Sequence, residues 1–348
     1  MSKTEPKQQP DRGGPAQPLV IVKDLKKHFP IRSGLLGRQT ATVRAVDGVS
    51  FSVRKGETLG IVGESGCGKS TTARLLIGLI EHDEGRIVFD GEALGDDISL
   101  KDMRKSMQMV FQDSYASLNP RLTIEDSVAF GAKVQGLSDP AGRARDLLAR
   151  VGLDPARFAR RFPHELSGGQ RQRVNIARAL AMAPRIVILD EAVSALDKSV
   201  EAQVLNLLAD LKQEFGLTYV FISHDLNVVR FISDRVLVMY LGEVIEIGPA
   251  EAIYASQAHP YTASLFSAMP SMDPDHRTVE PPLSGDPPNP VDPPSGCRFH
   301  TRCRFAEPVC SQQKPVLAPF GADADHLAAC HIHDQASGHS LAKEDAIS

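Results

Sequence analysis

The most informative part of this sequence reads Gly63-Glu64-Ser65-Gly66-Cys67-Gly68-Lys69-Ser70. It matches the eight-residue pattern of a phosphate-binding P-loop. Its glycines allow successive backbone N–H groups to face phosphate oxygens, and the start of the following helix adds attraction for an anion. The match predicts that these eight residues, together with Thr71, bind the phosphates of ATP.

The segments on either side of this loop have the character that a P-loop requires. Thr58–Val62 is a short apolar run typical of a strand, and Ser70–Ile80 has apolar residues at helical spacing. A chance glycine-rich turn would not need this order of strand, loop and helix. Lys69 is therefore expected to reach the β and γ phosphates, and Ser70 to bind Mg²⁺.

A second strand-like segment ends in two carboxylates. Ile186–Leu189 is apolar throughout, as in a strand buried on both faces, and Asp190 and Glu191 follow it. Beside a P-loop, Asp190 would hold Mg²⁺ and Glu191 would activate the attacking water as a general base. An acidic pair after a strand is often only a solvated turn, and the P-loop is what favours the catalytic interpretation.

The class of ATPase is indicated by the segment Leu166-Ser167-Gly168-Gly169-Gln170. It resembles the signature motif of ABC-type ATPases, in which the signature of one subunit caps the γ-phosphate bound to its partner's P-loop. The helical run Val174–Ala183 follows almost at once, so these glycines begin a helix and are not a flexible linker.

Other landmarks of ABC ATPases follow in the family's order. Gln112 resembles the Q-loop glutamine, which would link Mg²⁺ and the attacking water to a helical subdomain. Ser194-Ala195-Leu196-Asp197 resembles the D-loop that crosses the dimer interface. The resemblance implies that Asp197 belongs to the nucleotide site. His224 resembles the switch histidine that contacts the γ-phosphate. A lone glutamine or histidine would more often be a structural side chain.

Two more residues complete the expected nucleotide site. Phe29 lies where ABC ATPases place the aromatic ring that stacks on adenine, with core packing of Phe29 and a role for His28 as the alternatives. Cys67 occupies a free position of the P-loop pattern and is given no catalytic role. Because a helix N-terminus lowers a thiol pKa, Cys67 is expected to react with thiol reagents.

The order of elements predicts an α/β fold. Thr218–Ile222 is a third strand after Ile186–Leu189, with helical Ser199–Phe215 between them, which is parallel βαβ construction. Leu19–Phe29 and Val49–Val53 also read as strands. The resemblance implies a P-loop ABC-type nucleotide-binding domain with an antiparallel β subdomain, an inserted helical subdomain and a C-terminal cysteine-bearing extension.

Composition sets the expected domain boundaries and excludes some functions. The net charge of −4 gives no overall positive field, and no basic patch is convincing, so no nucleic-acid partner is expected. No apolar run approaches the roughly 20 residues that cross a bilayer, and residues 1–18 lack the apolar run of a secretory signal. The expected segments begin with a disordered tail at 1–18 and end with a tail at 336–348. Between them we expect the ABC ATPase domain at 19–250, which includes a helical subdomain at 113–165. A peptide-importer-type extension follows at 251–335, with a proline-rich linker at 280–294 and four cysteines.

Three segments narrow the family to oligopeptide and dipeptide importers. Ser117-Leu118-Asn119-Pro120-Arg121 resembles the stretch that these ATPases present to their membrane subunits, and Asp190–Asp197 has the form common in the group. His259-Pro260-Tyr261-Thr262 resembles the start of the group's C-terminal extension. His259 is expected to begin a helix there and not to be a ligand.

The resemblance implies an ATPase at the cytoplasmic face of the inner (plasma) membrane that energises peptide import. One P-loop and one signature require a second ATPase subunit, which in this family is usually a related chain. Two transmembrane permease subunits and an extracytoplasmic substrate-binding protein are the other implied partners. The alternatives are an importer ATPase for nickel, glutathione or another small solute, and a soluble ABC ATPase that acts on DNA or ribosomes.

Four cysteines near the end of the chain need a separate explanation. Five, six and nineteen residues separate them, which matches neither zinc ribbons nor common ferredoxins. The resemblance to cysteine-bearing importer ATPases implies a structural [4Fe-4S] cluster, separate from the nucleotide site, and zinc or unligated thiols remain alternatives. The expected ligands are Cys297, Cys303, Cys310 and Cys330, with His300, His331 and His333 open as further ones.

Overall fold

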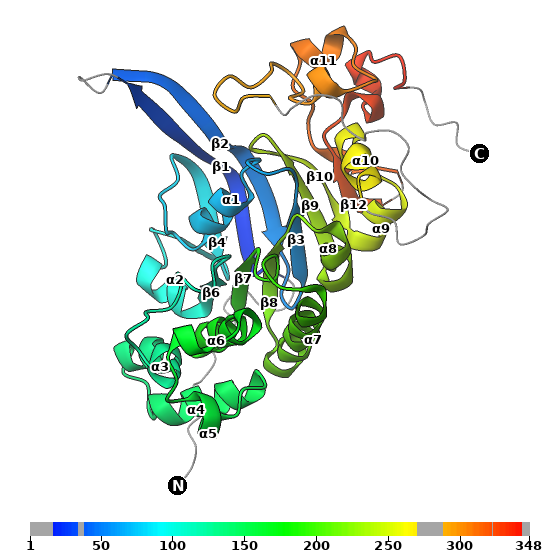
Figure 1. The fold of residues 1–348 in the computed structure, drawn as a ribbon. Helices are drawn as coiled ribbons and strands as arrows, with labels where there is room; N and C mark the ends of the chain where they lie inside the picture. Colours follow the sequence, from blue (N-terminus) through cyan, green and yellow to red (C-terminus); the bar gives the residue numbers. More distant parts are fainter. Residues whose placement is uncertain (1–16, 34–37, 270–287, 322, 343–348) are drawn as a thin grey trace.

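The computed structural model describes residues 17–33, 38–269, 288–321 and 323–342 (Figure 1). Most of the tail expected at 1–18, the first part of the proline-rich linker and the end of the tail expected at 336–348 lie outside these ranges. The described part of the chain is built on two sheets with helices around them.

The larger sheet has eight strands in the order β11-β12-β10-β9-β3-β8-β7-β6. Its central part is parallel, as the βαβ pattern predicts, and the carboxyl ends of these strands therefore meet at one edge. All residues of β3, β7, β8 and β9 are buried, which explains their continuous apolar sequences. The parallel strands are β3 (Thr58–Val62), β6 (Met107–Val110), β7 (Ile186–Asp190), β8 (Thr218–Ile222) and β9 (Arg235–Tyr240).

The two faces of this sheet belong to two cores. Alternate residues of a strand point to opposite faces, so Leu189 packs into one core and Ile188 into the other. One core contains helices α6, α7 and α8; the other contains α1, α2 and the smaller sheet. The bounds are α1 (Lys69–Leu76), α2 (Leu100–Ser106), α6 (Gly168–Leu180), α7 (Lys198–Phe215) and α8 (Leu226–Ile232).

The smaller sheet is antiparallel, in the order β2-β1-β4-β5, and confirms the expected antiparallel β element. Its two long strands extend beyond the segments that the sequence marks as strands. The bounds are β1 (Val20–Ser33), β2 (Arg38–Val53), β4 (Glu84–Phe89) and β5 (Glu92–Ala93).

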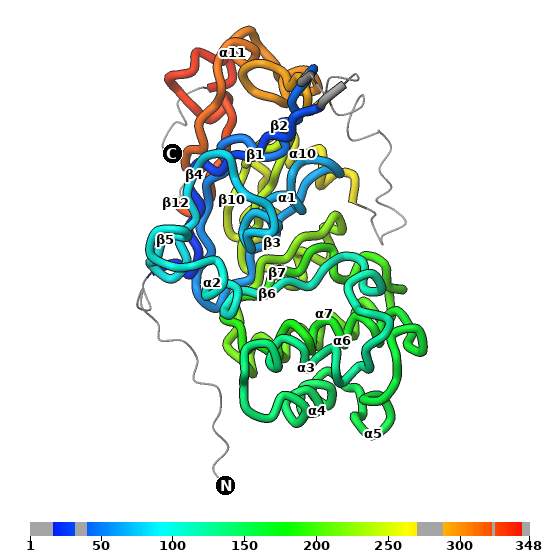
Figure 2. The backbone as a smooth tube through the Cα atoms, turned by 90° about the vertical axis from the view of Figure 1, so that its left-hand side faces the viewer, coloured from blue at the N-terminus to red at the C-terminus, as the bar shows by residue number. Residues whose placement is uncertain are grey.

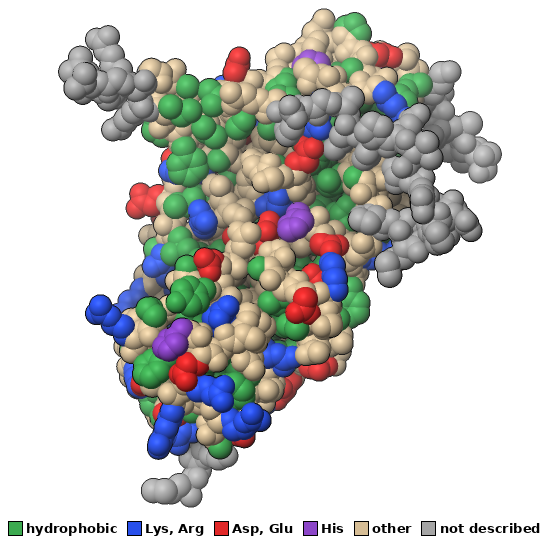
Figure 3. All heavy atoms as spheres, in the orientation of Figure 1, with side chains coloured by type: hydrophobic (Ala, Val, Ile, Leu, Met, Phe, Trp, Pro, Cys, Tyr) green, Lys and Arg blue, Asp and Glu red, His purple; other side chains and the backbone are tan. Residues whose placement is uncertain are grey.

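Short helices fill the connection from β6 to β7 and lie at one end of the molecule (Figure 2). They are α3 (Ile124–Val134), α4 (Pro140–Arg150), α5 (Pro155–Phe158) and the 3₁₀ turn η1 (Pro163–Glu165). Thr123, Asp139 and Asp154 cap α3, α4 and α5 through their side chains, each cap contributing about 1 kcal/mol. Lys and Arg side chains gather at this end (Figure 3). Part of this charge is balanced, since Arg145 pairs with Glu125 and Arg150 with Asp146.

The C-terminal segments return to the larger sheet. Strand β12 (Asp323–Ala328) pairs antiparallel with β10 (Glu243–Pro249), and β11 (Ala318–Phe320) pairs with β12. The sequence analysis did not foresee these strands. The remaining elements are α9 (Ala250–Ala255), α10 (Pro260–Ser267), η2 (His300–Arg302), α11 (Pro308–Gln312), η3 (His331–His333) and η4 (Gln335–Ser337). Within the described ranges, every helix is too short or too polar to span a bilayer.

Candidate nucleotide site and cysteine cluster

The P-loop joins β3 to α1, and its glycines allow close backbone approach. Gly63 has φ of 147°, and a Cβ there would lie 2.2 Å from the carbonyl oxygen of Met239. Gly68 has φ of 110°, and its Cβ would lie 2.3 Å from the carbonyl oxygen of Ala45. A side chain at either position would force backbone apart, so the loop requires glycine at both.

Lys69 places a positive charge within this loop. Its side chain is buried, and the ammonium donates to the carbonyl oxygens of Gly63 at 2.8 Å and Glu64 at 2.9 Å. Through these two hydrogen bonds, the backbone of the loop surrounds the Lys69 ammonium. The charge is therefore held where the phosphates of a nucleotide would meet the loop.

Ser70 and Asp190 offer oxygen ligands beside Lys69. The Ser70 hydroxyl donates to Asp190 Oδ1 at 2.9 Å, which joins the end of β7 to the start of α1. Burial raises the pKa of Asp190, although the Ser70 hydrogen bond acts in the opposite direction. A cation here would favour the ionised carboxylate that burial disfavours, and hydroxyl and carboxylate oxygens suit Mg²⁺. The residues therefore fit a magnesium site.

The carboxylate of Glu191 contacts side chains from two other parts of the chain. Its Oε2 accepts a hydrogen bond of 2.8 Å from Gln112 Nε2 and lies 3.4 Å from His224 Nδ1. Glu191 has φ of 48°, an uncommon backbone conformation for a residue with a side chain. It turns the chain out of β7 directly after Asp190. The structure thus brings together Gln112, Glu191 and His224.

The signature segment forms the first turn of α6. The Ser167 hydroxyl accepts from the Gln170 N–H at 3.3 Å, and Gln170 Oε1 accepts from the Ser167 N–H at 3.0 Å, which is a capping box. A Cβ on Gly169 would lie 2.4 Å from Val200 Cγ1 on α7, so glycine is needed for helix packing. Asp197 caps α7 by accepting from the Val200 N–H at 2.9 Å.

Phe29 and His28 occupy different environments on β1. Phe29 is 38% exposed, whereas His28 Nε2 lies 3.0 Å from Asp47 Oδ1. The His28 side chain is 30% exposed, so the two rings differ more in their polar partners than in exposure. The Cys67 side chain is buried, and burial raises its thiol pKa in spite of the nearby Lys69, which disfavours the expected reaction with thiol reagents.

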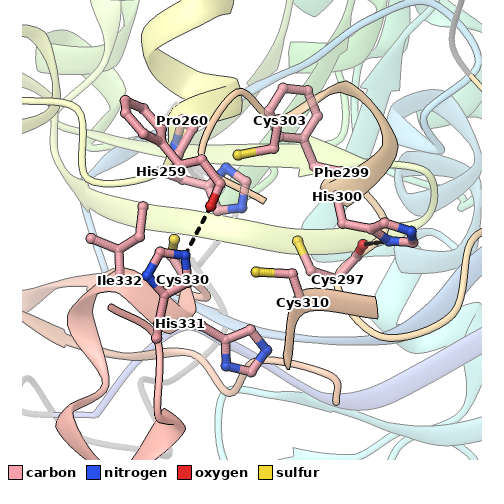
Figure 4. Close-up of a pocket in the computed structure, with 12 residues that line it drawn as sticks. His259, Pro260, Cys297, Phe299, His300, Cys303, Cys310, Cys330, His331 and Ile332 are labelled. Atoms are coloured by element: carbon pink, nitrogen blue, oxygen red, sulfur yellow. Dashed lines mark hydrogen bonds between the residues drawn. The ribbon is translucent and has the colours of Figure 1, made fainter. Parts of the chain in front are cut away.

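Four cysteines from the C-terminal segments line one small cavity (Figure 4). All four are free thiols, and the backbone N–H of Cys297 donates to the carbonyl oxygen of Cys310 at 2.7 Å. Burial raises the pKa values of Cys297 and Cys330 to about 12, and the neighbouring thiols add to the shift. Among the described residues, no group of three or more His, Cys, Asp or Glu side chains could hold a metal ion. The cysteines are Cys297, Cys303, Cys310 and Cys330.

The sequence analysis missed a contact between the C-terminal segments and the P-loop. The Glu64 carboxylate accepts two hydrogen bonds from the guanidinium of Arg302, and the Glu64 N–H donates to the Tyr261 hydroxyl at 2.8 Å. Arg302 and Glu64 are 238 residues apart. No local pattern at either position could have predicted the pair.

Comparisons with known proteins agree with the geometry. The ABC transporter family matches residues 46–194, and the C-terminal region of oligopeptide/dipeptide transporters matches residues 245–310. The oligopeptide transport ATP-binding protein AppF of Bacillus subtilis is 50% identical over 90% of this chain and 97% of its own. A probable peptide ABC transporter ATP-binding protein of Sinorhizobium fredii is 49% identical over 92% of this chain and 91% of its own.

Solved structures show the same fold. CbiO1 of Clostridium perfringens, part of an ABC transporter complex, has a TM-score of 0.59 and 29% identity over 71% of this chain and 95% of its own. A dimeric ATP-binding cassette bound to ADP and Pi has a TM-score of 0.58 and 31% identity over 66% of this chain and 98% of its own. With its P-loop, its acidic strand end and its C-terminal segments, this chain belongs to the ATP-binding proteins of ABC transporters, in the oligopeptide/dipeptide group.

Proposed function

We propose that this chain hydrolyses ATP to energise the import of peptides through partner membrane subunits. The observation that carries the proposal is the convergence of Gln112 and His224 on Glu191, next to the Ser70–Asp190 pair. Relatives named as peptide import or oligopeptide transport ATP-binding proteins match most of the chain and support the choice of cargo.

The ground-state complex follows from the P-loop geometry. Lys69 and the backbone N–H groups of residues 63–71 bind the phosphates, and Phe29 stacks on adenine. Ser70, Asp190 and Gln112 would hold Mg²⁺, which would supply positive charge to neutralise the phosphates. The Ser70 hydroxyl holds the Asp190 carboxylate through a hydrogen bond of 2.9 Å.

Hydrolysis requires one activated water in line with the γ-phosphate. Glu191 removes a proton from that water, while Gln112 fixes the orientation of the Glu191 carboxylate. The water oxygen bonds to the γ-phosphorus and the bond to the β-phosphate oxygen breaks, which gives ADP and phosphate. His224, beside Glu191, contacts the γ-phosphate and reports its presence.

The second half of each ATP site comes from another ATPase subunit. Ser167, Gly168, Gly169 and Gln170 at the start of α6 cap the γ-phosphate on the partner's P-loop, and Asp197 lies at the same interface. The partner is a related chain in a heterodimer. Cooperation of the two chains makes ATP binding close the dimer and hydrolysis open it.

Residues 113–165 form an inserted helical subdomain that contacts two transmembrane permease subunits. Exposed apolar side chains support this assignment: Phe130 is 58% and Val134 66% exposed on α3, and Tyr115 precedes Ser117–Arg121. An extracytoplasmic substrate-binding protein delivers the peptide. The chain itself lies peripherally at the cytoplasmic face of the inner membrane, with its ATPase domain at 19–250 and its extension at 251–335.

The four cysteines of the extension hold a [4Fe-4S] cluster. All four cysteines line one cavity, which supports this ligand set. In a four-iron cluster the thiolates bind different iron atoms, so the four sulfurs need not lie close enough to coordinate a single ion. Binding iron would remove the protons that burial stabilises on Cys297 and Cys330. Its role is structural, because the cluster ties together three segments with few regular elements.

A glutathione importer is the second candidate. The glutathione import ATP-binding protein GsiA of Pectobacterium atrosepticum is 51% identical over 79% of this chain, although this chain covers only 45% of that protein. The nucleotide chemistry would be the same for either cargo.

Copurification separates the main proposal from its alternatives. When the tagged chain is expressed in its native host and extracted in mild detergent, a related ATPase and two membrane proteins should copurify with it. Reconstituted complex should then hydrolyse ATP faster with peptide than with glutathione or nickel. Recovery of the chain with DNA or ribosomes, without membrane proteins, would refute the transport proposal.

A further inference from the structure

The turn that carries Cys297 and Cys303 reaches the P-loop through Arg302. This guanidinium donates from Nη1 to Glu64 Oε2 at 2.9 Å and from Nη2 to Glu64 Oε1 at 3.1 Å, a two-bond pair. Nη1 also donates to the Tyr240 hydroxyl at 3.3 Å. The Arg302 side chain is only 6% exposed and that of Glu64 20%, so solvent screens the pair weakly.

The same turn is anchored by an aromatic cluster. Phe299 is fully buried, with ring centroids 5.5 Å from Tyr240 and 5.4 Å from Tyr261. Tyr261 in turn accepts the Glu64 N–H through its hydroxyl. Both the backbone and the carboxylate of Glu64 are therefore held by groups that belong to, or pack on, the C-terminal segments.

Arg298, at the other end of the turn, contacts residues 241 and 243, which lie next to the P-loop. It donates to the carbonyl oxygen of Leu241 and pairs with Glu243 at 3.1 Å. The adjacent Gly242 N–H donates to the carbonyl oxygen of Cys67 at 2.8 Å, inside the P-loop. Two arginines of one turn thus hold the loop, one directly and one through residues 241–242.

The cysteine cavity fixes the shape of this turn. The N–H of His300 donates to the Cys297 carbonyl oxygen at 3.0 Å, and the N–H of Cys303 donates to that of His300 at 3.3 Å. The backbone N–H of Cys297 also donates to the carbonyl oxygen of Cys310 at 2.7 Å. Arg298 and Arg302 lie between two cavity cysteines, so packing of the cavity acts together with buried Phe299 in placing both side chains.

We propose that Arg302 is a positioning residue of the nucleotide site, through which the folded state of the cysteine cluster sets the affinity of the P-loop for Mg²⁺-ATP. The proposal rests on the proposed ATP-binding function. Arg302 neutralises Glu64, whose carboxylate would otherwise repel incoming phosphates, and holds the loop in its binding shape. The proposal departs from the expectation that the cluster is separate from the nucleotide site. By reciprocity, bound ATP stabilises the turn.

Nucleotide titration of the full-length chain with a fluorescent ATP analogue and Mg²⁺ tests the proposal. Arg302→Gln should weaken binding by about fivefold or more, at the lower end of typical coupling between sites. Combining it with Glu64→Gln should restore most of the lost affinity, because no unpaired carboxylate remains. Arg304→Gln, an exposed arginine on the other side of Cys303, is the matched control and should bind as the wild type does.

Each outcome of this titration has a defined meaning. Unchanged affinity in Arg302→Gln, an equal loss in Arg304→Gln, or an additive loss in the double variant would overturn the proposal. Failure of the wild type to bind ATP would instead contradict the proposed function. If Arg302→Gln does not fold, hydrogen exchange of the wild type decides: Mg²⁺-ATP should slow exchange in residues 297–303, and no change there would overturn the coupling.

Discussion

In the proposed mechanism, Glu191 is the residue that activates the attacking water. Its unusual φ of 48° and its contacts with Gln112 and His224 hold the carboxylate at one place beside Asp190. The Glu191→Gln variant keeps the side-chain shape but cannot remove a proton. We expect turnover to fall by about 10²- to 10⁴-fold with ATP binding near normal, so that Mg²⁺-ATP traps a closed dimer. Phosphate release at the wild-type rate from the assembled transporter would exclude Glu191 as the base.

At the residue scale, local motifs predict well and distant contacts do not. Ser70 and Asp190 could be paired from sequence because each ends or begins an element of known type. Local sequence could not show the burial of Cys67, which is set by the rest of the fold and raises the thiol pKa. Arg302 was missed because its partner lies 238 residues away in sequence.

The first turn of α6 allows the signature to be tested apart from folding. A Cβ on Gly168 would meet only Leu196 Cδ2, at 3.8 Å, whereas one on Gly169 would lie 2.4 Å from Val200. Gly168→Asp, like Ser167→Arg, should therefore leave ATP binding to the isolated chain intact and block ATP-driven dimer closure. Size-exclusion chromatography with Mg²⁺-ATP measures closure. Lost ATP affinity with closure intact would contradict the role of the signature.

His259, the buried N-cap of helix α10, should make the stability of the fold depend on pH. His259 caps α10 by accepting the Tyr261 N–H at 3.0 Å, and burial lowers its pKa to about 4 from 6.5, against the pull of Glu246. Between pH 6.5 and 4 the unfolded chain takes up a proton that the folded chain does not. The unfolding free energy should fall across this window, by up to about 3 kcal/mol.

Urea unfolding between pH 7 and 5 measures this dependence. The window lies above the ordinary pKa of Glu246, whose own pKa is lowered in the fold. His259→Asn keeps a capping oxygen without a titrating ring, so its stability should change less over that range. An unchanged slope in the variant would show that another group is responsible.

At the element scale, the sequence predicts regular core elements better than edges. Strands β3 and β8 match the expected ranges, since uninterrupted apolar runs specify buried parallel strands. Helix α1 ends earlier than expected, at Leu76, before Gly78 with φ of 66°. Strands β11 and β12 were not foreseen, because pairing with β10 and not local sequence makes Asp323–Ala328 a strand.

For the whole molecule, the proposed [4Fe-4S] cluster would link stability to metal content. Anaerobically purified chain should be brown and contain about four irons, and Ser at any of the four cysteine positions should lower iron content and thermal stability. The buried Cys67, outside the cavity, is the matched control position for iron content. Stoichiometric zinc without iron would refute the [4Fe-4S] assignment.

The central claim joins ATP hydrolysis at this site to peptide uptake by the whole transporter. Its most direct test is accumulation of labelled peptide in proteoliposomes that contain the complete complex, with ATP on the side of this chain and phosphate release measured in parallel. The account predicts peptide uptake that depends on Mg²⁺-ATP, exceeds uptake of glutathione, and is lost with phosphate release when Glu191 is replaced by Gln. Undiminished peptide uptake and phosphate release by the Glu191→Gln complex would contradict it.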